Sequence, residues 1–216
     1  MTLTFDLYWS FRSPYSYLVT QRLVALEAAY DVRCNVRIVY PIAVRQADFF
    51  AHLDPLWVSY LMRDIVRTGE FLGIPIRWPV PDPVVMDFAT RTYPAQQPHI
   101  HRLSQLGQLA AERGCGLAFI DEVSRVIWDG SVDQWHEGDH LTHAAARAGL
   151  ELTEMDRVVA AEHERLDSAI KASQDAQRVG GHYGVPLMVF AGEPFFGQDR
   201  FDQLKWRLEQ AGLARR

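Results

Sequence analysis

One stretch decides the fold of this chain: Leu3-Thr-Phe-Asp-Leu-Tyr-Trp9, followed after three residues by Ser13-Pro-Tyr-Ser-Tyr17. Apolar and polar side chains alternate from Leu3 to Trp9, as in a strand with one apolar face. Pro14 suits the first position of a helix because its φ is already set and it has no amide hydrogen to leave unpaired, which makes Ser13 the N-cap. The stretch therefore predicts a strand leading into a helix, with a hydroxyl at the positive end of the helix dipole.

The residues that follow complete a βαβ unit. Apolar side chains recur at helical spacing as far as Tyr30, and apolar and polar residues then alternate again over residues 32–40. Two strands joined by a helix within about forty residues are expected to be parallel, with a right-handed crossover.

The rest of the chain changes character twice. Residues 43–179 have helical periods interrupted by prolines and glycines, and Thr153 is interpreted as the cap of the last of these helices. A strand signal returns at Leu187–Phe190, followed by a turn and a second short apolar run, which predicts a β-hairpin. Asp199 then precedes an amphipathic helix. The helices expected in the middle of the chain cover residues 57–73, 93–114, 117–128, 135–148 and 153–179.

The order β-α-β, helical segment, β-β-α is the plan of an α/β thioredoxin-like fold in which a large all-helical insertion interrupts a mixed sheet. We expect residues 1–42 and 180–216 to form the thioredoxin-like domain and residues 43–179 to form a helical insert domain. The chain has no internal repeat and no flexible linker, so the insert is expected to pack against the sheet.

Composition excludes several classes of protein. The formal net charge is −5 and the 22 lysines and arginines are scattered, which argues against a nucleic-acid partner. No apolar run approaches the length of a membrane span, and the N-terminus lacks the features of an export signal. Cys34 and Cys115 form no disulfide pattern and are interpreted as inert thiols. We expect a cytoplasmic protein without a membrane partner.

Several motifs resemble those of one family, the kappa-class glutathione transferases and 2-hydroxychromene-2-carboxylate isomerases, which are glutathione-using relatives of DsbA-type oxidoreductases. Their order and spacing match over nearly the whole chain. The matching segments are Ser13-Pro-Tyr-Ser-Tyr17 at the start of the first helix, Gly184-Val-Pro186 in a loop with a cis-proline, Gly197-Gln-Asp-Arg200 before the last helix, and Trp128-Asp-Gly130 in the insert.

The resemblance implies that the first helix and the cis-proline loop hold glutathione. The Ser13 hydroxyl would donate a hydrogen bond to the glutathione sulfur, and such a bond, worth about 1.5–3 kcal/mol, would lower the thiol pKa by about one to two units. A cis bond between Val185 and Pro186 would turn the Val185 backbone toward the peptide. Without the resemblance, Ser13 is a cap that contributes about 1 kcal/mol and the proline follows an ordinary trans bond.

The third motif would bind the other end of glutathione. The resemblance implies that Asp199 accepts the γ-glutamyl ammonium and that Gln198 donates an amide to the adjacent carboxylate. By propensity alone Asp199 is an N-cap, and Arg200 is as readily a surface or interdomain ion pair as a ligand contact.

The pocket for a second substrate is less well defined, because the family's Lys and Asn residues have no clear counterpart between residues 43 and 57. A carboxylate would need a cation and an aromatic ring would need a stacking partner. The candidates for these roles are Arg45, Arg63 and Arg67 as cations, and Trp57, Trp78 and Trp128 as aromatic partners.

The resemblance implies a glutathione-dependent isomerase acting on a small aromatic substrate that resembles 2-hydroxychromene-2-carboxylate. The alternatives are a kappa-class-like glutathione transferase and a non-catalytic thioredoxin-like module that binds peptides or partners. Disulfide exchange is disfavoured, because Ser13 stands where DsbA-type enzymes have a nucleophilic cysteine. Glutathione is the expected cofactor and no metal is expected, since His136, His140 and His143 form no metal motif. A homodimer is expected because members of the family are commonly dimers.

Overall fold

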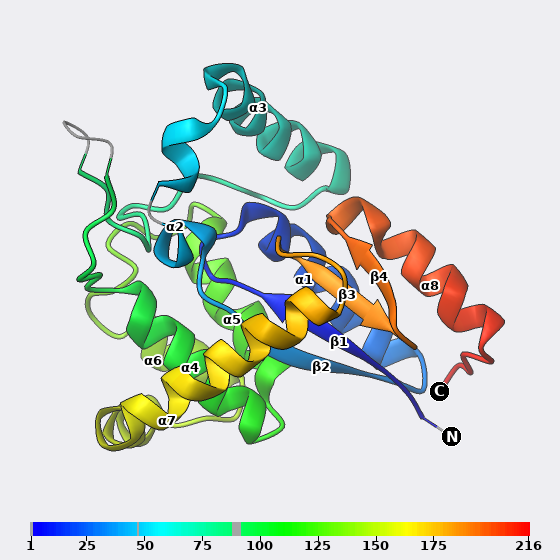
Figure 1. Ribbon diagram of the computed structural model, residues 1–216. Coiled ribbons are helices and arrows are strands. Elements are labelled where there is room, and N and C mark those ends of the chain that lie inside the picture. The colour runs from blue at the N-terminus through cyan, green and yellow to red at the C-terminus, as the bar shows by residue number, and fades with distance from the viewer. Residues whose placement is uncertain (1, 47, 88–91) are drawn as a thin grey trace.

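The structure is a computed structural model that describes residues 2–46, 48–87 and 92–216 (Figure 1). Its elements follow the expected β-α-β, helical segment, β-β-α order. They are β1 (Leu3–Trp9), α1 (Pro14–Ala29), β2 (Val32–Ile38), α2 (Ile42–Arg45), the 3-10 helix η1 (Phe49–His52), α3 (Pro55–Leu72), α4 (Ile100–Glu112), α5 (Gly116–Trp128), α6 (His140–Arg147), α7 (Leu152–Val179), β3 (Leu187–Phe190), β4 (Glu193–Phe196), the 3-10 helix η2 (Gln198–Arg200) and α8 (Phe201–Gln210).

The four strands form one mixed sheet in the order β2-β1-β3-β4. β1 and β2 are parallel along their full length, and β3 runs antiparallel to both β1 and β4. Ala191 and Gly192 form the two-residue hairpin turn, both with positive φ, as the right-handed twist of a hairpin favours. The prediction of an α/β thioredoxin-like fold with a helical insertion is confirmed.

The sheet is buried on both faces at the end that leads into α1. Leu7, Tyr8 and Trp9 are all buried, although successive side chains of a strand point to opposite faces. Tyr8 packs with Val39 and Leu187 on one face, whereas Leu7 and Trp9 belong to the main hydrophobic core. This end of the sheet is therefore a fixed platform for the residues that follow it.

The inserted helices continue the core of the sheet. β2 contacts α4, α5 and α7, and α1 packs against α5. One hydrophobic cluster contains residues of the strands and residues of these helices. Figure 1 shows α8 beside β4 at one side of the molecule and α4, α6 and α7 toward the other. The expected packing of the insert on the sheet is confirmed, while the boundaries at residues 42 and 180 remain a prediction.

Two helices begin later than the sequence pattern indicates. α4 starts at Ile100 and not at residue 93, because Pro94 and Pro98 interrupt any earlier helix. α6 starts at His140 and not at residue 135, since Gly138 has a φ of +60° just before it.

The cap of α7 is also different from the one expected. The Glu151 carboxylate, and not Thr153, accepts hydrogen bonds from the Thr153 and Glu154 amides. A carboxylate one residue before the helix can therefore replace the expected hydroxyl. Among the described residues, no helix is both long enough and apolar enough to cross a membrane.

A close approach of α4 to the sheet yields a stability prediction. A Cβ on Gly107 would lie 2.8 Å from Cε2 of the buried Phe11 and 3.2 Å from Cδ1 of Ile38. Alanine is favoured over glycine in a helix by about 1 kcal/mol, but overpacking a core costs about 1–3 kcal/mol. We expect Gly107→Ala to lower the free energy of unfolding in urea by up to about 2 kcal/mol.

A substitution at Phe11, the side chain that a Cβ on Gly107 would approach most closely, provides the control. In a Phe11→Leu background, the same Gly107→Ala change is expected to be less costly, which a double-mutant cycle measures. If Gly107→Ala stabilises the protein, helix propensity dominates and the close packing does not.

Candidate active site

Ser13 lies at the N-terminus of α1, where it is the N-cap. Its backbone is extended, with φ −97° and ψ 112°, and its Oγ accepts a hydrogen bond from the Ser16 amide at 3.1 Å. The predicted cap is confirmed. The hydroxyl also points toward the carbonyl oxygen of Val185, 172 positions later in the chain, at 3.4 Å. That distance is at the limit for a hydrogen bond, so the hydroxyl hydrogen is easily redirected to a better acceptor.

The loop that carries Val185 contains the cis-proline that the resemblance implies. The Val185–Pro186 peptide bond is cis. Among the residues that the structure describes, no group accepts a hydrogen bond from the Val185 N–H, and only Ser13 donates to its carbonyl. Val185 therefore presents an open backbone donor and acceptor directly beside Ser13.

The residues on both sides of Val185 have their backbone groups satisfied. The Gly184 N–H donates to Nδ1 of His182 at 2.8 Å, and the Gly184 carbonyl accepts from Nε2 of Gln177 at 2.7 Å. The Pro186 carbonyl accepts from the Gly197 N–H at 2.9 Å. Because backbone groups normally find partners, the one open position in this row is the place where an added peptide would pair.

Gly197 begins the third motif and adopts a φ of +102°. Residues other than glycine are strained at this φ, so the turn favours glycine, and a Cβ would also lie 2.5 Å from Oδ1 of Asp199. Asp199 is exposed and accepts from Nη1 of Arg200 at 2.9 Å, which agrees with an ion pair for Arg200. The carbonyl and side-chain oxygens of Gln198 both accept from Nη1 of Arg22, at 3.1 and 3.4 Å.

The interpretation of Asp199 as an N-cap is wrong. A turn of 3-10 helix, η2, precedes α8, and no side chain caps either helix. Arg200 consequently occupies the cap position of α8, and the Asp199 carboxylate is not engaged by any of that helix's amides. Its only hydrogen-bond partner in the described part of the chain is the exposed Arg200 side chain.

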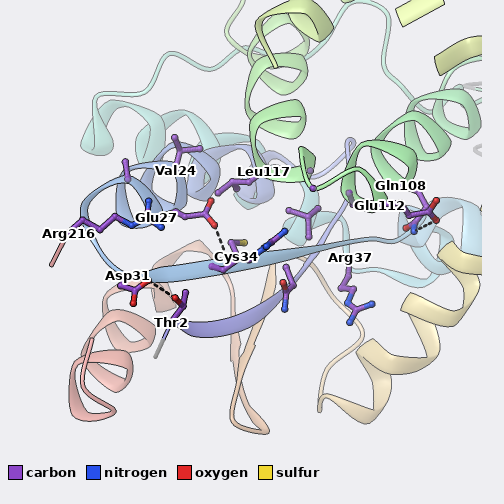
Figure 2. A pocket seen from close by; sticks show the side chains of 17 residues that line it. Thr2, Val24, Glu27, Asp31, Cys34, Arg37, Gln108, Glu112, Leu117 and Arg216 are labelled. Atoms are coloured by element: carbon purple, nitrogen blue, oxygen red, sulfur yellow. Dashed lines mark hydrogen bonds between the residues drawn. The ribbon is translucent and has the colours of Figure 1, made fainter. Parts of the chain in front are cut away.

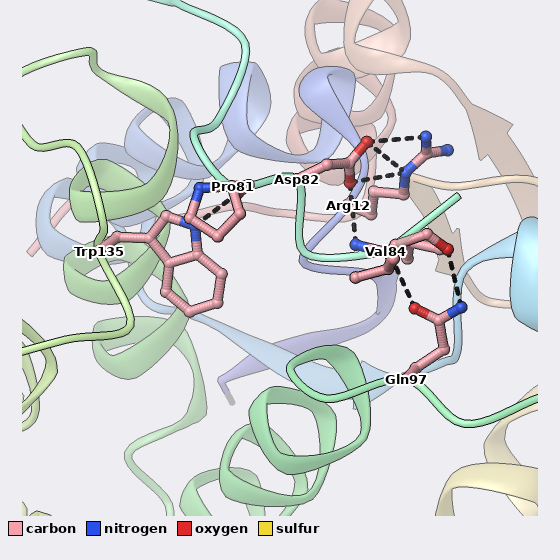
Figure 3. A network of polar contacts seen from close by, with 7 residues as sticks. Arg12, Pro81, Asp82, Val84, Gln97 and Trp135 are labelled. Atoms are coloured by element: carbon pink, nitrogen blue, oxygen red, sulfur yellow. Dashed lines mark hydrogen bonds and ion pairs between the residues drawn. The ribbon is translucent and has the colours of Figure 1, made fainter. Parts of the chain in front are cut away.

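Arg12, which immediately precedes Ser13, forms a bidentate ion pair with Asp82. Its Nε and Nη2 donate to the two carboxylate oxygens at 3.0 and 2.9 Å (Figure 3). Burial is the largest single effect and would lower the pKa of Arg12, but the charge and hydrogen bond of Asp82, together with Tyr93, outweigh it and raise that pKa above its ordinary value. The guanidinium carbon also lies 5.6–5.7 Å from the ring centroids of Phe50, Trp78 and Tyr93.

The segment that carries Asp82 is itself fixed by buried polar contacts. Nε1 of Trp135 donates to the Pro81 carbonyl at 2.7 Å, and Gln97 exchanges two hydrogen bonds with the Val85 backbone at 2.7 and 2.9 Å. Oδ1 of Asp82 also accepts from the Val84 amide at 2.9 Å (Figure 3). The insert therefore holds the carboxylate that neutralises the cation next to Ser13.

Aromatic rings connect the cis-proline loop to this ion pair. We call Phe49, Phe50, Trp57, Tyr93 and Tyr183 the aromatic cluster. Phe49 lies between Tyr183 and Phe50, with ring centroids 6.4 and 5.2 Å away, and Phe50 contacts Trp57 and Tyr93 at 6.1 and 5.8 Å. Trp57 is 42% exposed, so the cluster presents apolar surface to solvent.

Arg45 is a half-buried cation whose hydrogen bonds go to neutral groups. Its Nη1 and Nη2 donate to Oε1 of Gln177 at 3.3 Å and to the Tyr183 carbonyl at 2.9 Å, while its Nε is buried without a partner. No carboxylate pairs with it in the described part of the chain. Burial, with the nearby Arg178 charge as a smaller cause, lowers the pKa of Arg45 to about 10. An anion at this place would be favoured.

Other predicted pocket residues lie elsewhere. Trp128 is wrongly assigned to the pocket: its side chain is 0% exposed and donates from Nε1 to the Phe11 carbonyl at 2.9 Å, so it cannot contact a substrate. Arg63 is exposed on α3, and Arg67 forms an ion pair with Asp64 of the same helix. Neither arginine contacts Ser13 or Val185 in the described part of the chain, although Asp64, the partner of Arg67, accepts a hydrogen bond from the Tyr15 hydroxyl.

A separate hollow of about 900 Å³ lies along β2 (Figure 2). It contains Cys34, whose amide donates to Oε1 of Glu27 at 3.2 Å, but neither Ser13 nor Val185 lines it. Burial raises the pKa of the Cys34 thiol well above its ordinary value, so the thiol stays protonated and unreactive. This hollow is not a site of thiol chemistry.

Comparison with known proteins identifies the fold family. A family model described as the DSBA-like thioredoxin domain matches residues 4–209. The chain belongs to the DSBA-like thioredoxin domain family. A search of curated proteins found no match.

Solved structures of this family are similar over almost the whole chain. A 2-hydroxychromene-2-carboxylate isomerase is 21% identical with a TM-score of 0.70, covering 97% of this chain and 96% of its own. A probable DsbA oxidoreductase from Streptomyces coelicolor is 18% identical with a TM-score of 0.66, covering 97% and 89%. The cytosolic disulfide reductase DsbM from Pseudomonas aeruginosa, solved with GSH, is 16% identical with a TM-score of 0.60, covering 97% and 98%. These identities show a shared fold.

Sequence patterns did not single out four residues that shape this member of the DSBA-like family: Arg12, Asp82, Gln177 and His182. Arg12 follows a strand and precedes a cap, and no pattern marks its partner 70 positions away. Gln177 lies in an otherwise solvated last turn of α7. Only its burial, which depends on the packed loop, distinguishes it from the neighbouring polar residues.

The Arg12–Asp82 ion pair leads to a second prediction. The Arg12 and Asp82 side chains are only 13% and 24% exposed, so Asp82→Ala leaves a largely buried cation without its counter-charge. We expect a loss of about 3 kcal/mol in the free energy of unfolding in urea.

The matched control is Asp133→Ala, which removes the partner of Arg77 from an ion pair whose side chains are 46% and 60% exposed. Exposed pairs contribute at most about 1 kcal/mol. Equal losses in the two variants would contradict a structural role for burial of the Arg12–Asp82 pair.

Proposed function

We propose that this chain is a glutathione-dependent isomerase acting on an aromatic substrate with a conjugated carbonyl group, similar to 2-hydroxychromene-2-carboxylate. One observation carries the proposal: the Val185 backbone lies beside a hydroxyl, and not a thiol, at the N-terminus of α1. Among the described residues its N–H has no acceptor, and its carbonyl has only the long contact with Ser13. Such a site can bind a peptide that carries its own thiol. The structure of DsbM with GSH supports glutathione as that peptide.

Glutathione would bind as an added strand across the cis-proline loop. Its cysteinyl N–H and C=O would pair with the carbonyl and amide of Val185. The γ-glutamyl end would then extend past Pro186 toward Gly197, whose N–H donates a hydrogen bond to the Pro186 carbonyl. Asp199 would accept the ammonium, exchanging its exposed ion pair with Arg200 for the ligand, and Gln198 would donate to the γ-glutamyl carboxylate.

Ser13 would stabilise the thiolate of this bound glutathione. Its oxygen already accepts from the Ser16 amide, so its hydrogen is free to leave the long contact with Val185 and donate to sulfur. The positive end of α1 favours the same charge. Together these effects would lower the thiol pKa of bound glutathione by about one to two units.

The reaction is a reversible addition. The thiolate attacks the β-carbon of the carbon–carbon double bond conjugated to the carbonyl, and the electron pair of that bond moves onto the carbonyl oxygen as an enolate. The former double bond is now single and rotates. When the enolate collapses, the double bond re-forms with altered geometry and the carbon–sulfur bond breaks, so the thiolate is regenerated.

The surroundings of Ser13 suit an aromatic carboxylate as the second ligand. The substrate ring would pack against the aromatic cluster, with Trp57 as its exposed member. The carboxylate would meet Arg45, a half-buried cation that has no carboxylate partner among the described residues. Arg12 would contribute a fixed positive field, although Asp82 already neutralises most of its charge.

Disulfide exchange finds little support in this member of the family. No cysteine occupies the start of α1, Cys34 is buried with a raised pKa, and Cys115 lies at the start of α5. A kappa-class-like transferase would use the same thiolate but would retain the carbon–sulfur bond in its product.

Accounting for glutathione during turnover tests the reaction. An isomerase uses glutathione as a cofactor, so the free thiol concentration is expected to remain constant while substrate is consumed. Net loss of thiol in proportion to product would contradict the isomerase and support a transferase. Absence of glutathione binding in calorimetry at millimolar concentration would support a non-catalytic peptide-binding module.

A substitution tests the role of Ser13. In Ser13→Ala, we expect the thiol pKa of bound glutathione, measured by ultraviolet thiolate absorbance, to rise by about one to two units. Turnover at neutral pH should fall about ten- to a hundredfold. Ser13→Thr, which keeps a hydroxyl and a capping group, is the control and should retain a lowered thiol pKa. An unchanged thiol pKa in Ser13→Ala would exclude the proposed stabilisation.

A further inference from the structure

His182 occupies the loop between α7 and β3, three positions before Val185. Its ring is stacked between two others: the Phe196 centroid lies 3.7 Å away at an interplanar angle of 21°, and the Tyr183 centroid lies 4.8 Å away at 11°. The ring is therefore held in one orientation by the hairpin on one side and by its own loop on the other.

The orientation of the ring directs Nδ1 at the backbone of Gly184. The Gly184 N–H donates to Nδ1 at 2.8 Å, which requires that this nitrogen carry no proton. Gly184 also has no room to move toward the rings, because a Cβ there would lie 2.6 Å from Cε2 of Phe196 and 3.0 Å from Cε1 of His182. The residue immediately before Val185 is thus fixed by the neutral imidazole.

The opposite side of Gly184 has a support of its own. Nε2 of Gln177 donates to the Gly184 carbonyl at 2.7 Å, and Oε1 of Gln177 accepts from Arg45 at 3.3 Å. These groups do not change charge near neutral pH. His182 is the support of this peptide unit that protonation can remove.

We propose that His182 is a positioning residue whose neutral ring holds Val185 in the orientation that pairs with glutathione, so that protonation of His182 weakens glutathione binding in mildly acidic solution. The imidazolium would carry hydrogens on both nitrogens, and its Nδ1–H would face the Gly184 N–H. The two donors cannot bond, so the loop must shift. This inference rests on the proposed glutathione site.

The charged and titratable groups around the loop do not change the expected direction of the effect, which is weaker glutathione binding at lower pH. They are Tyr183, which stacks on the ring, Arg45 of α2, which donates to the Tyr183 carbonyl, and Arg178 of α7, whose charge acts on Arg45. Glu193, the charged residue of β4, is paired with Arg207. Burial of the ring lowers the pKa of His182. Since the folded pKa lies below the ordinary value of about 6.5, the loop is intact above that pH and is lost as pH falls through the folded pKa.

Calorimetric titration with S-methylglutathione, a form of glutathione whose sulfur does not titrate, over about pH 5 to 8 tests the proposal. For the wild-type protein we expect the dissociation constant to increase as pH falls, by up to tenfold per unit below the pKa of His182. His182→Phe keeps a stacked ring but has no acceptor, so it is expected to bind glutathione weakly, without this pH dependence.

His182→Asn is the rescue variant, because its Oδ1 can accept from the Gly184 amide and does not titrate. We expect it to recover most of the affinity lost in His182→Phe, with a flat profile. His163→Asn, an exposed position on α7, is the control and should show the wild-type profile. The proposal is overturned if His182→Phe binds like wild type, or if His182→Asn keeps the acid-induced loss of affinity.

A second measurement does not depend on glutathione. In NMR spectra, the amide signals of Gly184 and Val185 should move with the titration of His182, and this movement should be absent in His182→Asn. If these amides do not respond to His182, the positioning role is wrong even where glutathione binds. If these amides respond but no glutathione binds at any pH, His182 does position the loop, and the proposed function is wrong.

Discussion

The antiparallel pairing of β1 with β3 is the constraint on which the rest of this structure depends. Leu7 pairs with Met188 and Tyr8 with Leu187, so the chain leaves β1 for α1 at the same edge where the cis-proline loop enters β3. Backbone hydrogen bonds fix this register, and packing on both faces of β1 prevents a slip, since a slip of one residue would move Leu7 and Trp9 out of the main core and bring Tyr8 into it. Ser13 and Val185 therefore meet although most of the chain separates them.

The insertion supplies polar side chains that support the residues on both sides of the candidate site. It supplies Asp82, which neutralises the cation next to Ser13, and Gln177, which satisfies the Gly184 carbonyl. Each contact satisfies a polar group that would be costly to leave unpaired in a buried position. Val185 differs from its neighbours: in the part of the chain that the structure describes, its N–H has no acceptor and its carbonyl has only the long contact with Ser13, whereas the backbone groups of Gly184 and Pro186 are hydrogen-bonded. Under the proposed function, such a site would use the thiol of a bound ligand, in contrast with a site whose own cysteine performs the chemistry.

The sequence predicts local features well because local rules govern them. The alternation of residues 3–9 and the Ser13–Pro14 pair give β1, α1 and the cap, and the order of elements gives the fold. Prediction fails where tertiary packing decides. The pattern could not show that Trp128 supports Phe11 from within the core, or that η2 displaces Asp199 from a capping position. The ion pair of Arg12 and the hydrogen bond of His182 depend on groups that only the complete fold brings together, so no sequence pattern predicts them.

A crystal structure of the protein with bound glutathione would show whether Val185 and Ser13 hold the ligand. We expect the cysteinyl backbone to pair with the amide and carbonyl of Val185, and the sulfur to lie within hydrogen-bonding distance of the Ser13 Oγ. Glutathione whose sulfur points away from Ser13, or that binds elsewhere, for example in the hollow beside Cys34, would contradict this expectation.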